Sequence, residues 1–348
     1  MKRPTFAGFL AGCALSITLG TTAPAHAALL GWAVGANGTI VMTPDGGSTW
    51  VTENSGVLTN LNGVQFVSSV LGFAVGDGGV LIRTADGGQT WATVPTGTAL
   101  NLNSVAFFDS LRGVAVGADG VRLRTTDGGL TWSSTGVTTG TLYDIAVTGA
   151  SSAIAVGAGG ITVRTTDFGI TWAVPVDSSP ASTNNLFDAE AAGGFTLFAV
   201  GAGGAVTRTT DGGVTWSNTF INPAFGDLFD GQSLPSNQFL VTGSTGNISR
   251  STDGGVTFAA PLAITPNTSL FDLQFIDALQ GLAVGANGNA VRSTDGGFTW
   301  SSLIAASSYD LYAIALANGQ AVFVPEPGTL VLLALGMIGV AISRRRSS

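Results

Sequence analysis

The sequence has few of the side chains that most enzymes use for chemistry. Of its 348 residues one is Cys, one is His and 10% are charged, and the only Lys is Lys2. Residues 28–324 contain no Cys, His or Lys, which excludes Ser-His-Asp and Cys-His nucleophile systems and the usual His-rich zinc sites. We therefore expect no metal and no cofactor. The same stretch has 20 acidic residues and 8 Arg, a net charge of 8 − 20 = −12, which disfavours nucleic-acid binding.

A repeated phrase is what the sequence has in abundance. Thr-Ala-Asp-Gly-Gly-Gln-Thr-Trp at Thr84–Trp91 returns as Thr-Thr-Asp-Gly-Gly-Leu-Thr-Trp at Thr125–Trp132, and there are seven copies in all. Their aspartates, 40 to 44 residues apart, are Asp45, Asp86, Asp127, Asp167, Asp211, Asp253 and Asp295. The phrase closes on Trp50, Trp91, Trp132, Trp172, Trp216 and Trp300, and on Phe258 in the sixth copy.

The repeat unit has the pattern of a blade of short strands. Apolar runs such as Leu61–Val67 are separated by clusters of Gly, Asn, Asp and Ser, which is typical of strands joined by turns. Units of 40 to 45 residues with four short strands are typical of β-propeller blades. Because seven such units fill residues 28–324, we predict an all-β, seven-bladed β-propeller of four-stranded antiparallel blades.

The first unit lacks the strand that opens every later unit. A segment of that kind, Leu311–Leu316, follows the seventh copy of the phrase. We predict that it forms the innermost strand of the blade whose other strands come from residues 31–56, so that the N- and C-terminal strands close the ring and leave no open edge. Residues 321–324 could compete with Gly31–Gly35 for the second place in that sheet, and we favour Gly31–Gly35.

The D-G-G phrase predicts a hydrogen-bonded hairpin. Gly-Gly supplies positive-φ positions, the aspartate can accept backbone N–H bonds across the turn, and the closing aromatic ring can fill the wedge between neighbouring sheets. The pattern [ST]-x-D-x-G-x-T-W resembles the Asp-box, or bacterial neuraminidase repeat, of sialidases, xyloglucan-cleaving glycosidases, sortilin-type receptors and photosystem II assembly and stability factors. Over residues 28–324 the chain is most similar to the last of these families. The resemblance implies that the seven copies are structural and lie away from any active face.

Six of the eight arginines within residues 28–324 recur three residues before the repeated aspartate. They are Arg83, Arg124, Arg164, Arg208, Arg250 and Arg292. One interpretation has each guanidinium bonded to its own blade's aspartate or loop carbonyls. The other, implied by the resemblance to the assembly factors, is an arc of cations that docks an acidic partner.

Carboxylates are the only candidates for acid–base catalysis. Asp188 with Glu190, and Asp227 with Asp230, are close in sequence. We interpret both pairs as parts of solvated loops between blades, and the Trp side chains, Trp32 included, as occupied by the repeat. We therefore predict a binding or structural module that is not an enzyme, with a carbohydrate-active hydrolase and an assembly factor for a membrane complex as the alternatives.

Residues 1–27 have the pattern of a secretory signal peptide. Lys2 and Arg3 precede an apolar stretch, and cleavage is expected after Ala27. The alternative is a lipoprotein signal that leaves Cys13 lipidated.

Residues 325–348 resemble a PEP-CTERM sorting signal. Pro325, Glu326 and Pro327 precede the apolar residues 328–342, expected to form a short transmembrane helix, and then Arg344–Arg346. The resemblance implies transient anchoring in the inner membrane of a Gram-negative bacterium, cleavage by an exosortase, and release to the outer surface or matrix. Polysaccharide or an envelope protein is the expected partner there. An ordinary C-terminal anchor is the alternative.

Overall fold

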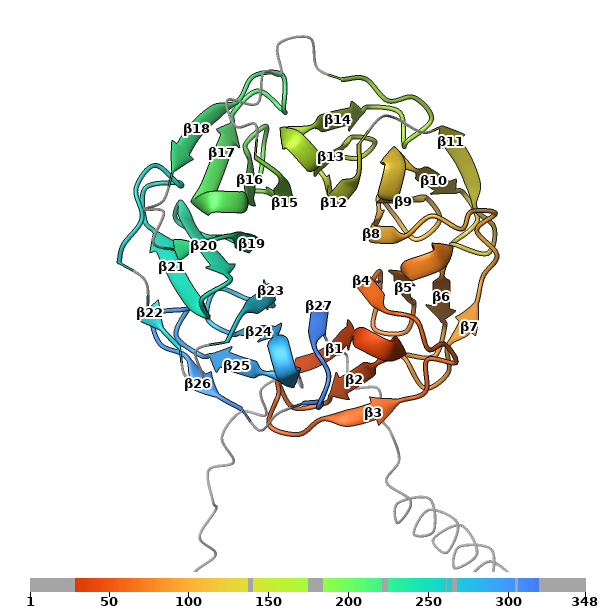
Figure 1. Cartoon of the computed structure of the whole chain (residues 1–348), viewed down its shortest axis with the longest axis horizontal. Coiled ribbons are helices and arrows are strands. Elements are labelled where there is room, and N and C mark those ends of the chain that lie inside the picture. The colour runs from red at the N-terminus through yellow and green to blue at the C-terminus, as the bar shows by residue number, and fades with distance from the viewer. Residues whose placement is uncertain are drawn as a thin grey trace, which may run out of the picture.

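The computed structural model describes residues 29–136, 140–174, 184–220, 225–260, 262–264, 268–303 and 306–318. Seven small antiparallel sheets stand like blades around a common centre (Figure 1). The predicted seven-bladed β-propeller is therefore confirmed. We number the blades from the one that contains β1.

Each blade runs outward from an inner strand, and we give the strands of each rank in blade order. The inner strands are β27 (Leu311–Asn318), β4 (Leu61–Phe66), β8 (Leu102–Phe107), β12 (Leu142–Val147), β15 (Leu186–Ala191), β19 (Leu228–Leu234) and β23 (Leu270–Phe275). The second strands are β1 (Leu29–Gly35), β5 (Gly72–Gly76), β9 (Gly113–Gly117), β13 (Ala153–Gly157), β16 (Leu197–Gly201), β20 (Gln238–Gly243) and β24 (Gly281–Gly285). The third strands are β2 (Ile40–Thr43), β6 (Leu81–Thr84), β10 (Arg122–Thr125), β14 (Thr162–Thr165), β17 (Ala205–Thr209), β21 (Asn247–Ser251) and β25 (Ala290–Ser293). The outer strands are β3 (Val51–Glu53), β7 (Ala92–Thr93), β11 (Ser133–Gly136), β18 (Ser217–Phe220), β22 (Leu262–Ala263) and β26 (Ser301–Ser302).

The ring closes as the sequence predicts. β27 pairs with β1 from Leu29 opposite Asn318 to Gly35 opposite Leu311, and β1 continues the sheet to β2 and β3. The competing segment, residues 321–324, lies outside the described residues.

Blade 4 departs from the four-stranded pattern. Within the described residues its sheet has three strands, and a single bridge between Arg164 and Ala173 takes the place of the outer strand.

The two faces of the ring are made by different turns. Between the second and third strands lie the short 3₁₀ turns η1 (Ala36–Gly38), η2 (Asp77–Gly79), η3 (Ala118–Gly120), η4 (Ala158–Gly160), η5 (Ala202–Gly204) and η7 (Ala286–Gly288). Their central residue has positive φ, which explains why it is Asn, Asp or Gly, as in Asn37 (φ 56°) and Asp119 (φ 51°). We call this the η face. Because strands alternate in direction, the D-G-G turns lie on the opposite side, which we call the hairpin face.

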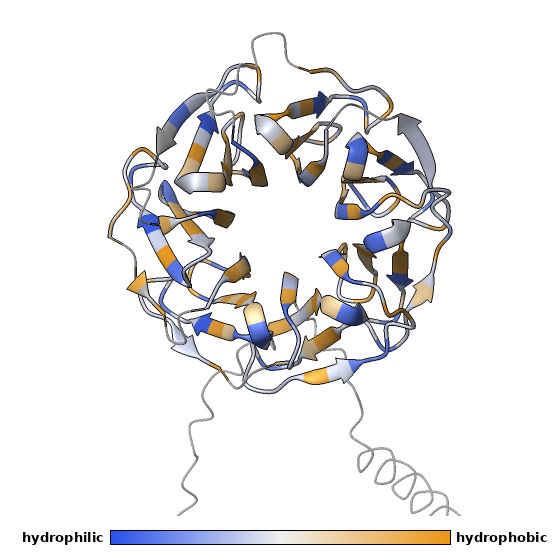
Figure 2. Ribbon diagram, viewed as in Figure 1, coloured by the Kyte–Doolittle hydropathy of each residue, from blue (hydrophilic) through white to orange (hydrophobic). Residues whose placement is uncertain are grey.

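The core is divided into wedges between consecutive blades. In each blade the second strand, counted from the centre, is almost wholly buried. In Figure 2 apolar segments recur along the strands of all seven blades. Between blades 2 and 3, for example, Phe73 packs with Phe107 and Trp132. The repeated Trp residues enter these wedges as predicted; Trp132 is 9% exposed and the others are partly buried.

Candidate functional site at the centre of the ring

Four consecutive inner strands carry an aspartate at their third residue. These are Asp144 on β12, Asp188 on β15, Asp230 on β19 and Asp272 on β23, and Glu190 lies two residues after Asp188. We call these five residues the carboxyl belt. The prediction that Asp188, Glu190 and Asp230 lie in solvated connecting loops is wrong. They are strand residues, and Asp230 is only 9% exposed.

The belt caps the open edges of the inner strands. An inner strand has no neighbouring strand on the side that faces the centre of the ring. The backbone N–H groups on that side would therefore lack a hydrogen-bond partner. Each belt aspartate accepts one such N–H from the next blade. The bonds run to Asp144 Oδ2 from Ala189 N (3.1 Å), to Asp188 Oδ2 from Gly231 N (3.1 Å), to Asp230 Oδ2 from Leu273 N (2.7 Å) and to Asp272 Oδ2 from Ile314 N (2.8 Å).

A second row of acceptors lies two residues further along. Glu190 Oε1 accepts the N–H of Ser233 at 3.2 Å, and Gln232 Oε1 accepts that of Phe275 at 2.5 Å. Gln65 does the same for Phe107, and Gln274 for Leu316. The inner strands are thus joined by side-chain bonds from one blade to the next.

Burial of several carboxyls close together raises their pKa values. Desolvation is the main cause, and repulsion between neighbouring carboxylates adds to it. The pKa of Glu190 is raised to about 8 and that of Asp230 to about 6, while the pKa values of Asp144, Asp188 and Asp272 are also raised. Because the pKa of Glu190 is raised to about 8, the belt carries less negative charge at neutral pH than five free carboxylates would. Within the described residues no group of three or more His, Cys, Asp or Glu could hold a metal ion.

An arc of aromatic rings lies on the η-face side of the belt. The second residue of each inner strand is an extra residue in a β-bulge, and in five successive blades it is aromatic. The rings are Tyr143, Phe187, Phe229, Phe271 and Tyr312, all partly exposed, with neighbouring centroids 5.4 to 5.9 Å apart. We call them the aromatic collar. Sequence analysis missed it, although the recurring Leu-[Tyr/Phe]-Asp of β12, β15, β19 and β23 is its signal.

Blades 2 and 3 complete the circle with amides. Asn62 Nδ2 donates to the carbonyl of Leu102, and Asn103 Nδ2 donates to that of Leu142. These bonds link blade 2 to blade 3 and blade 3 to blade 4, two of the three neighbouring pairs that the belt does not link. The collar is therefore one-sided, aromatic over blades 4 to 7 and 1 and polar over blades 2 and 3.

Asp227 has a different place from the belt. It directly precedes β19, and its Oδ1 accepts the N–H of Gly203 in η5 at 2.9 Å. Asn60, Asn101, Asn185 and Asp310 cap other 3₁₀ turns in the same way. Of the two predicted carboxylate pairs, Asp188 and Glu190 therefore share the belt, whereas Asp227 belongs to the η face.

The seven hairpins of the repeated phrase, D-G-G in six copies and Asp167-Phe168-Gly169 in the fourth, share one hydrogen-bond pattern. In the third copy Asp127 Oδ1 accepts the hydroxyl of Thr125 (2.8 Å) and the N–H of Thr131 (3.0 Å), while Oδ2 accepts the hydroxyl of Thr131 (2.6 Å). Gly129 N donates to Thr125 Oγ1 at 3.0 Å. The hydroxyl bond from Thr131 is the main cause that lowers the pKa of Asp127 to about 2. The aspartates are thus occupied within their own turns.

The repeated arginines bridge blades on the hairpin face. Arg83 Nε donates to the carbonyl of Gly128 (3.0 Å), Arg124 Nε to that of Phe168 (2.8 Å) and Arg250 Nη1 to that of Gly296 (2.8 Å). Each acceptor directly follows the aspartate of the next blade's hairpin. The prediction that the arginines bond their own blade's aspartate or loop carbonyls is therefore wrong for these three, because the blades stagger around the ring.

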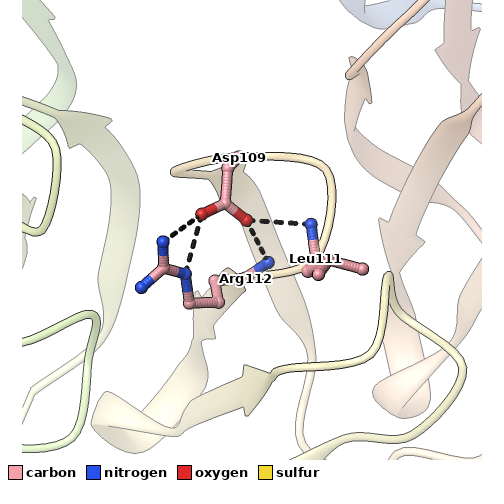
Figure 3. Close-up of polar contacts among 3 residues, drawn as sticks. All are labelled: Asp109, Leu111 and Arg112. Carbon is pink, nitrogen blue, oxygen red and sulfur yellow. Dashed lines mark hydrogen bonds and ion pairs between the residues drawn. The ribbon is translucent and has the colours of Figure 1, made fainter.

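An ion pair between Arg112 and Asp109 lies within a turn. Arg112 Nη2 lies 2.5 Å from Asp109 Oδ2, and Asp109 Oδ1 accepts the N–H groups of Leu111 and Arg112 (Figure 3). The guanidinium stacks 3.7 Å from the ring centre of Phe168 in the next blade. It is the only ion pair among the described residues. None of the six repeated arginines thus forms an ion pair with its own aspartate there.

The sequence comparison decides the family. The family described as photosynthesis system II assembly factor YCF48 matches residues 23–85 and 85–258, which is more than half of the chain. The chain belongs to this family. A second match, to the PEP-CTERM protein-sorting motif, covers residues 323–346. No curated protein matches the sequence.

Solved structures agree with the fold of the YCF48 family. "YCF48 bound to D1 peptide" shares 24% identity, covers 70% of this chain and 82% of its own, and has a TM-score of 0.58. YCF48 from Cyanidioschyzon merolae shares 21% identity over 72% and 86% of the two chains, with a TM-score of 0.57. The GH74 xyloglucanase of Xanthomonas campestris shares 14% identity over 82% of this chain and 52% of the enzyme, with a TM-score of 0.62. At these identities the likeness concerns the fold alone.

The processing residues lie outside the described part of the chain. This holds for the predicted signal peptide with Cys13 and Ala27, and for Pro325, Glu326 and Pro327. In the described residues no helix is long and apolar enough to cross a membrane. The sorting motif implies export and recognition by an exosortase.

Proposed function

We propose that this protein is a non-enzymatic binding propeller, delivered to the cell surface or matrix, that holds polysaccharide at the aromatic collar. One observation carries the proposal: the belt carboxyls each accept a backbone N–H of the next blade. These carboxyls therefore hold neighbouring blades together, which favours a structural role for them over a catalytic one. The collar beside them is partly exposed and apolar. Rings of this kind stack on the apolar faces of sugars.

The attachment of the tail supports an outward-facing collar. Leu29 and Asn318 pair at the hairpin-face end of blade 1, where Leu29 O accepts the N–H of Gly46. The sorting motif begins at residue 323, so four residues separate it from β27. Four residues span at most about 14 Å. A membrane-held precursor thus has its hairpin face toward the membrane and its η face, with the collar, toward the outside.

Two other functions give different experimental results. The GH74 relative is a xyloglucanase, but this chain spans about half of that enzyme, and a glycosidase needs two carboxyls free on either side of a substrate bond. The YCF48 relatives suggest an assembly factor that holds a peptide. The surface-delivery motif at residues 323–346 favours an extracellular ligand instead.

The test compares binding with hydrolysis on the same sugars. Neutral and acidic polysaccharides are incubated with the parent, with Phe229→Ala in the collar, and with Phe298→Ala, an exposed ring on the hairpin face, as control. We expect retention of polysaccharide by the parent and the control, at least a fivefold weaker affinity for Phe229→Ala, and no new reducing ends. Sugar release that Asp230→Asn abolishes would indicate a hydrolase. Co-purification with a membrane complex, without any sugar binding, would indicate an assembly factor.

A further inference from the structure

A small pocket opens on the hairpin face between blades 5 and 6. It has a volume of about 210 Å³ and is lined by Thr196 and Arg208 of blade 5 and by Ser233, Ser236, Asn237 and Gly254 of blade 6. That volume is below the range of about 300–1,000 Å³ typical of pockets for drug-sized ligands. The pocket therefore fits one small group rather than a chain.

Arg208 lines this pocket and, like Arg164 and Arg292 among the described residues, lacks the bond that the other three repeated arginines make. Arg83, Arg124 and Arg250 each donate to the carbonyl that follows the aspartate of the next hairpin. For Arg208 the matching residue is Gly254, which lines the pocket, yet Arg208 makes no hydrogen bond to it among the described residues. Arg208 Nε is buried and has no partner, and its guanidinium lies 5.8 Å from the ring centre of Phe198. A buried donor of a charged group without an acceptor is costly.

A second unpaired donor comes from an exchange of residues in blade 6. In blades 2, 3 and 7 the sixth residue of the inner strand is Phe and faces a Gly of the second strand, as Phe107 faces Gly113. In blade 6 Ser233 stands in that place and faces Phe239. Phe239 supplies the ring that stacks on Phe198, with centroids 4.2 Å apart, in the same way as Phe107 stacks on Phe73. The wedge stays filled, while the hydroxyl of Ser233 is left buried without a partner.

The rest of the lining is uncharged and partly polar, with Ala192, Phe198, Leu234 and Pro235 as its apolar part. Ser236 and Asn237 form the tip of the turn between β19 and β20, both with positive φ, and Asn237 O accepts the N–H of Gly254. Glu190 bonds the N–H of Ser233, and its raised pKa of about 8 leaves it uncharged near neutral pH. Gln238 Oε1 is taken up by Arg250, which leaves its amide N–H₂ as a donor. The pocket thus offers donors and one cation.

We propose that this pocket binds the carboxylate of an acidic sugar. A guanidinium edge accepts a carboxylate in a planar, two-bond geometry, and a hydroxyl donor beside it completes the set. Serine, asparagine and glutamine side chains suit the sugar hydroxyls around that carboxylate. The choice of a sugar rests on the proposed function, whereas the choice of a carboxylate rests on the two unpaired donors.

The experiment titrates the purified protein with glucuronate, glucose, sulfate and an acidic tetrapeptide by calorimetry or NMR. The variants are Arg208→Gln and Ser233→Ala, and Arg124→Gln is the matched control because it removes the same charge from an arginine that is already bonded. We expect glucuronate to bind, glucose not to bind, and affinity to fall at least tenfold in Arg208→Gln and about threefold to tenfold in Ser233→Ala, with no change in Arg124→Gln. Ser233→Ala keeps the test valid if Arg208→Gln folds poorly.

Each of the following outcomes would contradict one part of the proposal. Equal binding of glucose and glucuronate, or equal losses in Arg124→Gln and Arg208→Gln, removes the pocket assignment. Sulfate or the tetrapeptide binding as tightly as glucuronate removes the sugar assignment. If glucuronate binding depends on Arg208 but the protein retains no polysaccharide, the pocket assignment is supported and the proposed function is contradicted.

Discussion

Leu311 pairs with Gly35, so the last described strand and the first belong to one sheet. β27 buries Leu311 and Ile314 against blades 7 and 1, and its N–H groups at Ile314 and Leu316 are held by Asp272 and Gln274 of blade 7. The C-terminal strand thus covers the inner edge of β1 and ties blade 1 to blade 7.

Removal of β27 should therefore open the ring. We expect a chain ended after Ser308 to melt at least 10 °C below the parent or to aggregate. In that chain β1 loses its partner strand, and Asp272 and Gln274 of blade 7 lose the N–H donors of β27. A chain ended after Asn318 keeps the strand and is the matched control. Thermal unfolding and light scattering provide the measurement. Equal melting of the two truncated chains would contradict the closure.

The hairpin and the wedge should contribute to stability by different amounts. Trp132→Ala leaves a cavity beside Phe73 and Phe107 and should cost about 3–5 kcal/mol of unfolding free energy. Asp127→Ala unpairs the turn and should cost about 1–3 kcal/mol. Urea unfolding measures both, with Trp132→Phe as the milder control, since blade 6 uses Phe258 in this place. Parent-like unfolding combined with lost ligand binding would assign the phrase to function instead.

The carboxyl belt should make the protein less stable at alkaline pH. Its pKa values are raised in the folded state, so folding binds protons, and the stability present below about pH 4.5 is lost as pH rises toward 8. The hairpin aspartates have lowered pKa values and act oppositely, but only below about pH 4. We expect the melting temperature to fall from pH 5 to pH 8.5. Glu190→Gln keeps the acceptor for Ser233 N and should reduce that fall; an unchanged slope would contradict the assignment.

The sorting tail should control release from the membrane. Replacement of Glu326, or deletion of Arg344–Arg346, should leave an unprocessed protein in the membrane fraction, because the exosortase motif spans residues 323–346. Immunoblots of membrane and medium fractions compare these variants with the parent. A tail of parental length in every sample would indicate an ordinary anchor.

Much of the fold could be predicted because its determinants are local. The bonds of Asp127 reach no further than four residues, and the positive φ values of Asn37 and Asp119 follow from their own turn. The spacing of the seven aspartates then gives the blade number, and the missing first strand gives the closure. The repeat pattern does not predict the three-stranded sheet that blade 4 has within the described residues, because only the pairing shows a single bridge between Arg164 and Ala173.

The site depends on contacts between units, which a repeat pattern does not reveal. The sequence favours a loop for Asp188 because the segments around it are rich in Gly, Asn and Ser. In the structure Asp188 is a residue of β15, directly after its bulge, and it accepts the N–H of Gly231 in the next blade. Arg83 likewise finds its acceptor one blade away.

By itself, the sequence determined the number of blades, the hairpin chemistry and the closing strand, because each depends on residues within one repeat or on counting repeats. Only the tertiary structure decided which side chains meet across blades. The stagger of neighbouring sheets turns Asp230 into a cap for Leu273, gathers Phe229 into an aromatic arc, and leaves Arg208 and Ser233 facing a pocket without partners.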